Sequence, residues 1–134
     1  MDTEQALSEL TEISSQIEAA CVLDSDGNLL ASTLPDDAAA RQFADAASAL
    51  LREARSAGGE RQLAQLEAAT LGGSVFLVLE SDRAVAAVTK PEPTAGLVFY
   101  DLKSCLRAAG TPGPGDGKPR PRGRKRETAN ESAA

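Results

Sequence analysis

The spacing of apolar residues divides residues 1–109 into three helices and five strands. In the first segment the apolar positions recur at helical spacing, and they are Leu7, Leu10, Ile13 and Ile17. This period predicts a helix over residues 3–18, with acidic residues in its first turn, where the helix dipole favours negative charge.

Two apolar segments, 19–24 and 29–33, then flank the sequence Ser-Asp-Gly-Asn. Asp-Gly between apolar segments is a strong signal for a β-hairpin, because Gly27 adopts a positive φ without steric strain. Together with Asp24, this segment also has part of the pattern of a calcium-binding loop. No glutamate stands at the distance that such a loop requires, and the flanks are strands, so we interpret the segment as a hairpin turn.

A long helix is predicted over residues 37–57, with an aspartate of Pro35-Asp36-Asp37 as its N-cap and Gly58-Gly59 at its end. At about 1.5 Å per residue it is roughly 30 Å long, as wide as a small domain. Its apolar stripe consists of Phe43, Ala46, Ala47, Leu50, Leu51 and Ala54. The charged residues that we place on the opposite face are Arg41, Asp45, Arg52 and Arg55.

Three more strands are predicted at 62–71, 74–80 and 84–89, the first two joined by a tight turn at Gly72-Gly73. Uninterrupted apolar strands are typical of the centre of a sheet, whereas half-polar strands are typical of its edges. By this criterion the central strands are 19–24, 74–80 and 84–89, and the edge strands are 29–33 and 62–71.

A last helix is predicted over residues 95–108, and its inward positions are Val98, Leu102, Cys105 and Leu106. This order of elements predicts an α+β fold, an α/β/α sandwich with a five-stranded antiparallel sheet. We assign residues 1–109 to this domain, which is small enough that burial against a second chain would stabilise it.

Residues 110–134 form a tail of different composition, rich in Gly, Pro, Lys and Arg and without a large apolar residue. The tail carries a net charge of +3 and the chain −6, so the domain carries −9. We expect the tail to be disordered, because it has too little apolar surface to offset its ordering entropy. Two roles for the tail are consistent with its sequence. It is either a solubilising extension or an electrostatic contact with an acidic partner, nucleic acid or anionic lipid.

The sequence lacks the commonest general base and the motifs that mark a catalytic or phosphate-binding site. There is no histidine, and no glycine-rich phosphate-binding motif occurs. Cys21 and Cys105 fall in segments predicted to be buried, so we interpret them as core residues in a reducing compartment. We therefore expect no enzymatic activity, no cofactor and no metal. With no signal peptide and no apolar run of about 18 residues, we expect no membrane-spanning segment and a cytoplasmic location.

Residues 3–108 resemble the Roadblock family, the dynein-light-chain-like regulators of small GTPases. The resemblance rests on the pattern Leu10-x-x-Ile13-x-x-x-Ile17-x-x-Ala20-Cys21-Val22-Leu23-Asp24-x-Asp26-Gly27-x-Leu29-Leu30-Ala31-Ser32. The Ala-rich helix with Phe43 and Leu50-Leu51, the Gly72-Gly73 turn and the strands up to Val88 extend it.

The resemblance implies a homodimer, or a heterodimer with a paralogous Roadblock protein. Family members join by pairing their third strands, here 62–71, and by packing their second helices, here 37–57, side by side. The implied interface residues are Phe43, Ala47, Leu50, Leu51, Ala54, Leu63 and Leu66. In bacterial relatives the dimer binds a Ras-like GTPase and acts on its GTP hydrolysis or localisation, in signalling and cell polarity.

The charged residues of the second helix have two readings. These residues are Arg41, Asp45, Arg52 and Arg55. They form either a contact with a partner, with one arginine as an arginine finger, or an ordinary solvated helix face. The alternative for the whole chain is a small sensory or ligand-binding module of profilin-, PAS- or GAF-like architecture. Such a module needs a lined cavity, and the chain has only three Phe and one Tyr to form one.

Overall fold

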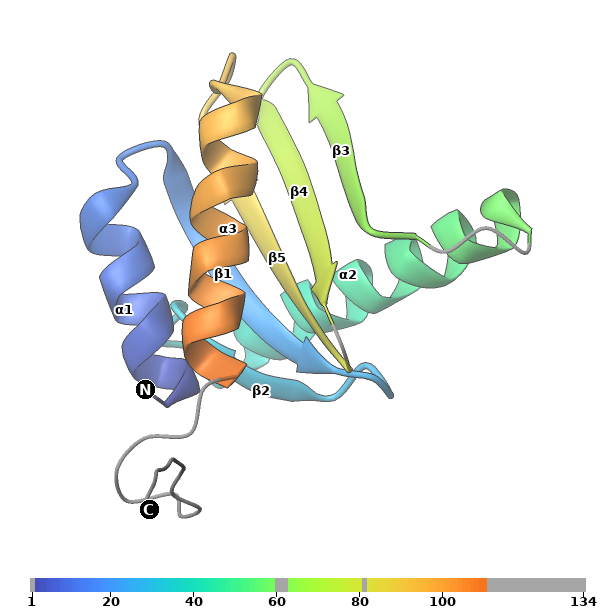
Figure 1. Ribbon diagram of the computed structural model, residues 1–134, viewed down its shortest axis with the longest axis horizontal. Helices are drawn as coiled ribbons and strands as arrows, with labels where there is room; N and C mark the ends of the chain where they lie inside the picture. Colours follow the sequence, from blue (N-terminus) through green and yellow to red (C-terminus); the bar gives the residue numbers. More distant parts are fainter. Residues whose placement is uncertain (1, 60–62, 81, 111–134) are drawn as a thin grey trace, which may run out of the picture.

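The computed structural model describes residues 2–59, 63–80 and 82–110. Gly110, predicted as the first residue of the tail, ends α3, and the predicted disorder of residues 111–134 lies outside the described range. The elements follow the predicted order around one sheet (Figure 1). Their bounds are α1 Thr3–Ile13, β1 Ile17–Asp24, β2 Leu29–Ser32, α2 Asp37–Gly58, β3 Gln65–Thr70, β4 Gly73–Glu80, β5 Arg83–Thr89 and α3 Ala95–Gly110.

The five strands form one antiparallel sheet in the order β2-β1-β5-β4-β3. The three uninterrupted apolar strands lie in the centre and the two mixed strands at the edges, so the predicted placement is confirmed. In the centre, Val22 of β1 lies opposite Val85 of β5, and Leu77 of β4 lies opposite Ala86.

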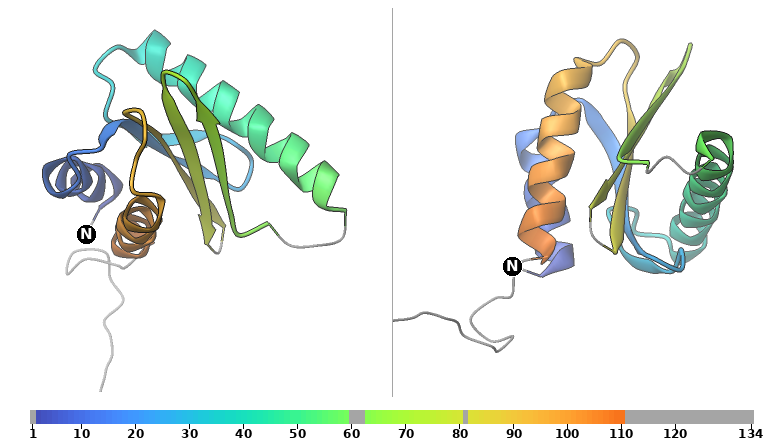
Figure 2. Two further views of the ribbon diagram at one scale, coloured as in Figure 1. Left: turned by 90° about the horizontal axis from the view of Figure 1, so that it is seen from above. Right: turned by 45° about the vertical axis from the view of Figure 1, so that its right-hand side comes forward.

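The helices form two layers, with α1 and α3 side by side over one face of the sheet and α2 over the other (Figure 2). The larger core lies under α1 and α3, where the rings of Phe76 and Phe99 meet edge to face with their centroids 5.0 Å apart. The core under α2 is smaller and consists of Cys21, Leu23, Ala44, Ala47, Leu51, Leu77, Ala84 and Ala86. The predicted inward residues of the last helix are all buried, which confirms that face of α3.

The first helix is shorter than predicted, because α1 ends at Ile13 and Ile17 begins β1. Ser14 caps the helix in an extended conformation, and the N–H of Lys90 donates to the carbonyl of Gln16. The shared helical spacing of the two isoleucines is therefore coincidental. Ile13 is 68% exposed, and the β-branched Ile17 is buried in the sheet.

The ends of α2 are those predicted. The carboxylate of Asp36 accepts a hydrogen bond from the N–H of Ala39 at 3.2 Å, and Gly59, with φ 67°, forms the C-cap. The buried row is rotated relative to the predicted stripe and consists of Ala40, Ala44, Ala47 and Leu51. Ala46 is exposed, contrary to the prediction. Small alanines allow α2 to approach the sheet closely, so the larger residues of the predicted stripe lie to one side of the contact.

Candidate functional site

The open edge of the sheet is formed by β3. This strand is shorter than the predicted 62–71, and it pairs with β4 from Gln65 opposite Val78 to Thr70 opposite Gly73. Within the described part of the chain, its other side has no neighbouring strand. Backbone N–H and C=O groups on that side are therefore available to a further strand.

Apolar side chains near this edge are only partly covered. Phe43 and Leu50 of α2 pack at the margin of the core under α2, and so do Leu63 and Leu66 beside and within β3. Ala54 is likewise partly exposed. Successive helical residues are about 100° apart, so the three residues of α2 share one flank of the helix. We call these five residues the α2–β3 surface.

The two other residues expected at a dimer interface lie deeper. Ala47 and Leu51 are 3% and 6% exposed, and they pack in the core with Cys21 and Leu77. They have little area left to contact a second chain directly. They belong instead to the buried cluster against which residues of the α2–β3 surface pack.

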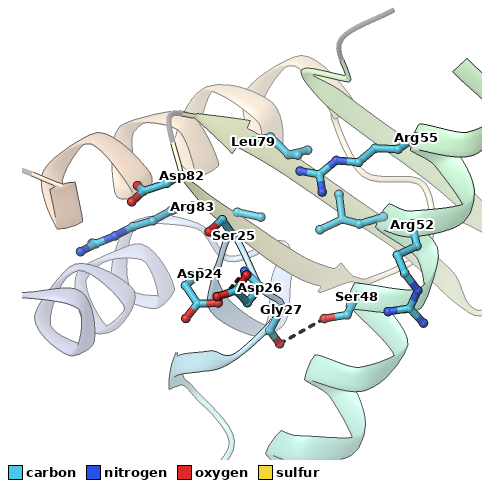
Figure 3. Close-up of a pocket in the computed structure, with 12 residues that line it drawn as sticks. Asp24, Ser25, Asp26, Gly27, Ser48, Arg52, Arg55, Leu79, Asp82 and Arg83 are labelled. Carbon is cyan, nitrogen blue, oxygen red and sulfur yellow. Dashed lines mark hydrogen bonds between the residues drawn. The ribbon is translucent and has the colours of Figure 1, made fainter. Parts of the chain in front are cut away.

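A cleft of about 200 Å³ lies where α2 passes the turns at one end of the sheet (Figure 3). Ser48, Arg52 and Arg55 of α2 line one side, and residues of the β1–β2 and β4–β5 turns line the other. Charges of both signs meet in this cleft, from Asp24, Asp26, Asp82, Arg52, Arg55 and Arg83.

The β1–β2 turn in this cleft is the predicted hairpin, and Asp24 fixes it. The Asp24 carboxylate accepts hydrogen bonds from the N–H groups of Asp26 and Asn28, each at 2.9 Å, and from the Asn28 side chain at 3.2 Å. These bonds, the one from the Asn28 backbone first, lower the pKa of Asp24. Gly27 has φ 87°, and its carbonyl accepts a bond from Ser48 Oγ at 3.2 Å, which ties α2 to the turn.

Two of the charged residues of α2, Arg52 and Arg55, lie beside the buried row, whereas the sequence predicted them on the opposite face. Helical spacing places Arg52 and Arg55 on the flank that faces the cleft, away from the α2–β3 surface. Arg41 and Asp45 are exposed on the same helix without lining the cleft. Among the described residues, these three arginines make no ion pair or side-chain hydrogen bond.

The two cysteines are buried in different cores, Cys21 under α2 and Cys105 under the α1–α3 layer. Burial raises the pKa of Cys21 to about 12 and that of Cys105 to about 11. Both thiols are therefore protonated at neutral pH and are weak nucleophiles. In the described ranges, no three His, Cys, Asp or Glu residues are grouped as metal ligands, and no helix is long and apolar enough to cross a membrane.

The features of this site are those of a contact surface: an open strand edge, an apolar helix flank and exposed arginines. A family model described as the Roadblock/LC7 domain matches residues 3–90. The chain belongs to the Roadblock/LC7 domain family. The matched range runs from the start of α1 beyond the end of β5, so it includes α2 and the open edge of β3.

Solved structures share the architecture of this Roadblock domain. A Roadblock/LC7 domain from Streptomyces avermitilis aligns with a TM-score of 0.74 at 22% identity, covering 82% of this chain and 96% of that one. MglB from Myxococcus xanthus aligns with a TM-score of 0.60 at 17% identity, covering 81% and 92%. The LokiProfilin2 of a complex with rabbit actin aligns with a TM-score of 0.55 at 15% identity, covering 80% and 95%. At these identities the likeness is one of fold, and it confirms the Roadblock/profilin-like architecture. Among curated proteins, no relative matches the chain.

The cleft itself was not identified from the sequence of the Roadblock domain. It is formed by two turns and a helix that are distant in the sequence, so no local pattern describes it. One signal was available: Ser48, Arg52 and Arg55 recur at i, i+4 and i+7, the spacing of a single helix face.

Proposed function

We propose that this Roadblock domain is a dimeric, non-enzymatic regulator or scaffold that binds a Ras-like small GTPase and modulates its GTP hydrolysis or its localisation. The observation that carries the proposal is the open edge of β3 next to partly exposed apolar residues of the same chain. An unpaired strand edge with an apolar flank is a surface that a second chain can cover.

The proposed dimer pairs β3 with β3 of the second subunit and packs the two α2 helices side by side. Pairing of identical edges about a two-fold axis joins two five-stranded sheets into one and satisfies the free backbone groups. The α2–β3 surface is then enclosed between the helices and the joined sheet. A paralogous Roadblock protein with the same edge would serve equally as the second subunit.

The proposed contacts with the GTPase are the charged side chains on α2, namely Arg41, Asp45, Arg52 and Arg55. All four are exposed. Exposed arginines without an internal partner attract an acidic surface and speed its association. We assign them contact with the GTPase; an arginine that also reached the nucleotide would additionally raise the hydrolysis rate.

The proposal is tested with a Ras-like GTPase from the same organism, loaded with GTP or GDP. Calorimetry measures binding, and single-turnover hydrolysis measures the effect on the reaction. We expect micromolar or tighter binding that differs between the two nucleotide states. Replacing Arg52→Ala or Arg55→Ala should weaken it about tenfold, the effect of losing one well-placed interface charge.

The matched control is Arg107→Ala. Arg107 is also exposed and is ion-paired with Glu80 at 3.0 Å, but it lies on α3, in the other helix layer. This variant should bind the GTPase as the original chain does. Equal weakening by all three variants would show a nonspecific effect of charge. Absence of binding in both nucleotide states would refute the GTPase part of the proposal.

The alternative of a small sensory or ligand-binding module has weaker support. Ligand pockets are lined mainly by apolar side chains, whereas half of the described residues that line the cleft beside α2 are charged. A small molecule that stayed bound to the chain through purification would favour the alternative.

A further inference from the structure

A second cavity lies on the other side of the molecule, in the seam between α1 and α3. Its volume is about 230 Å³, and it is lined mainly by apolar atoms. The residues that matter here are Leu10 and Ile13 of α1 and Asp101, Ser104, Cys105 and Ala108 of α3. Figure 2 shows these two helices side by side, on the face of the sheet opposite α2.

Asp101 is the unusual residue of this cavity. It is 7% exposed, and within the described residues its side chain has no hydrogen bond or ion pair. Within the described residues its carboxylate oxygens are not among the fully buried atoms without a partner, so they keep contact with solvent and are accessible to a group that enters the cavity. No Lys or Arg of the described residues lines the cavity, and Glu9 adds a second carboxylate. A cationic group that entered the cavity would therefore find an acceptor without a competing partner.

The surface around the cavity is apolar and exposed. Ile13, which lines the cavity, is 68% exposed. On α3, Leu97 and Tyr100 lie one helical turn before Asp101 and Ser104 and are 49% and 68% exposed. A long cationic side chain fits such a place, since its aliphatic stem packs on apolar residues while its charged end meets a carboxylate. Arg also forms two parallel hydrogen bonds with a carboxylate.

We propose that this cavity binds the chain's own basic segment, residues 118–126, with one Lys or Arg side chain paired to Asp101. The segment carries six cations separated by prolines and glycine: Lys118, Arg120, Arg122, Arg124, Lys125 and Arg126. The acidic partner expected for the tail is thus the Roadblock domain from which it extends. The proposal does not depend on the GTPase, because α2 and β3 do not line this cavity.

The length of chain permits this contact. Asp101 lies nine residues before Gly110, the last residue of α3, which is about 14 Å along the helix. The eight residues from Gly110 to Lys118 span up to about 26 Å when extended. The cations at 118–126 can therefore return along α3 as far as Asp101.

Amide NMR spectra of the full-length chain test the proposal. The original chain is compared with a tail variant in which the six cations are replaced by Gln. We expect shift differences at Ile13, Ser104 and Cys105, and we expect Asp101→Asn to abolish them. Asn keeps the size of Asp, so the fold is preserved. The control Asp82→Asn removes an exposed carboxylate of the β4–β5 turn and should leave the differences unchanged.

Limited trypsin digestion gives an independent readout at Arg122, Arg124, Lys125 and Arg126. In low salt, these sites should be cut about tenfold more slowly in the original chain than in the Asp101→Asn variant, the effect expected of one charge-assisted hydrogen bond. High salt should abolish the difference.

Three outcomes would overturn the proposal. The first is the absence of shift differences at the cavity, and the second is their persistence in Asp101→Asn. The third is their disappearance on dilution, which would assign the bound segment to another copy of the chain. Equal trypsin rates in both variants at low salt would also contradict it.

Discussion

At the residue scale, the two adjacent glycines where the chain passes from β3 to β4, Gly72 in the turn and Gly73 at the start of β4, have unequal roles. Gly73 has φ 149°, and a Cβ at this position would collide with the carbonyl oxygen of Thr89. A Cβ at Gly72 would meet nothing within 4 Å. Thr70 Oγ1 accepts the N–H of Gly72 at 3.2 Å and donates to the Gly73 carbonyl at 2.6 Å. In the sequence the two glycines look equivalent. They differ because β4 pairs with β5, which brings the backbone of Thr89 against Gly73 but not against Gly72.

The two glycines give a matched pair of substitutions. Gly73→Ala should lower the free energy of unfolding by more than about 2 kcal/mol, since it combines an unfavourable φ with a backbone overlap. Gly72→Ala should change it by no more than about 0.5 kcal/mol. Urea unfolding followed by circular dichroism measures both. Equal losses of unfolding free energy in the two variants would show that the close approach of Gly73 to Thr89 is not the reason why position 73 requires glycine.

The buried thiols make stability depend on pH in the alkaline range. In the unfolded chain a thiol has a pKa of about 8.5, whereas burial raises that of Cys21 to about 12. Above about pH 9 the unfolded state ionises first, so the free energy of unfolding falls by up to about 1.4 kcal/mol per pH unit for each thiol. Urea unfolding at pH 8, 9 and 10 should show a shallower decline in Cys21→Ala. An unchanged slope in that variant would contradict the burial of Cys21.

At the element scale, α2 shows what a sequence can predict about a helix and what it cannot. Its ends follow from local chemistry, because an aspartate at the N-cap and a glycine at the C-cap act within one turn. Its buried row does not, because the sheet selects the flank with the smallest residues, Ala40, Ala44 and Ala47. The end of α1 is missed for a similar reason, since Ile17 continues a helical spacing but pairs with Thr89 in the sheet.

The N-cap of α2 is testable by one substitution. Asp36→Ala removes the acceptor for the N–H of Ala39 and should lower the free energy of unfolding by about 1 kcal/mol. The control Glu53→Ala, at an exposed position inside α2, should have a smaller effect or a slight gain, because Ala is the best helix former. Thermal unfolding at matched pH compares the two. A larger loss from Glu53→Ala than from Asp36→Ala would contradict the assigned cap.

At the scale of the whole molecule, the apolar pattern was enough to predict which strands lie in the centre of the sheet and which at its edges. A strand that is buried on both faces is apolar throughout, whereas an edge strand also carries polar residues. The pattern could not predict the cleft beside α2 or the cavity that contains Asp101, since each is formed between elements that are distant in the sequence. The structure adds that the two flanks of α2 differ: one faces the cleft with Arg52 and Arg55, and the other carries the apolar residues Phe43 and Leu50.

This asymmetry predicts which substitutions disrupt the proposed dimer. Leu50→Lys and Ala54→Lys place a charge on the apolar flank and should weaken dimerisation at least about tenfold, because a buried unpaired charge is costly. Gln42→Lys adds the same charge at an exposed position of α2 and should leave the dimer intact. Thermal unfolding of the variants at high concentration verifies that they remain folded. Dissociation by Gln42→Lys alone would place the interface elsewhere.

The central claim is that the open edge of β3 and the apolar flank of α2 hold a second subunit. Size-exclusion chromatography with multi-angle light scattering on the full chain tests it most directly. We expect a mass of twice the 13.8 kDa of the chain at micromolar concentration, and a shift towards 13.8 kDa in Leu50→Lys. A mass of 13.8 kDa for the original chain up to high micromolar concentration, without a paralogous partner present, would contradict the homodimer.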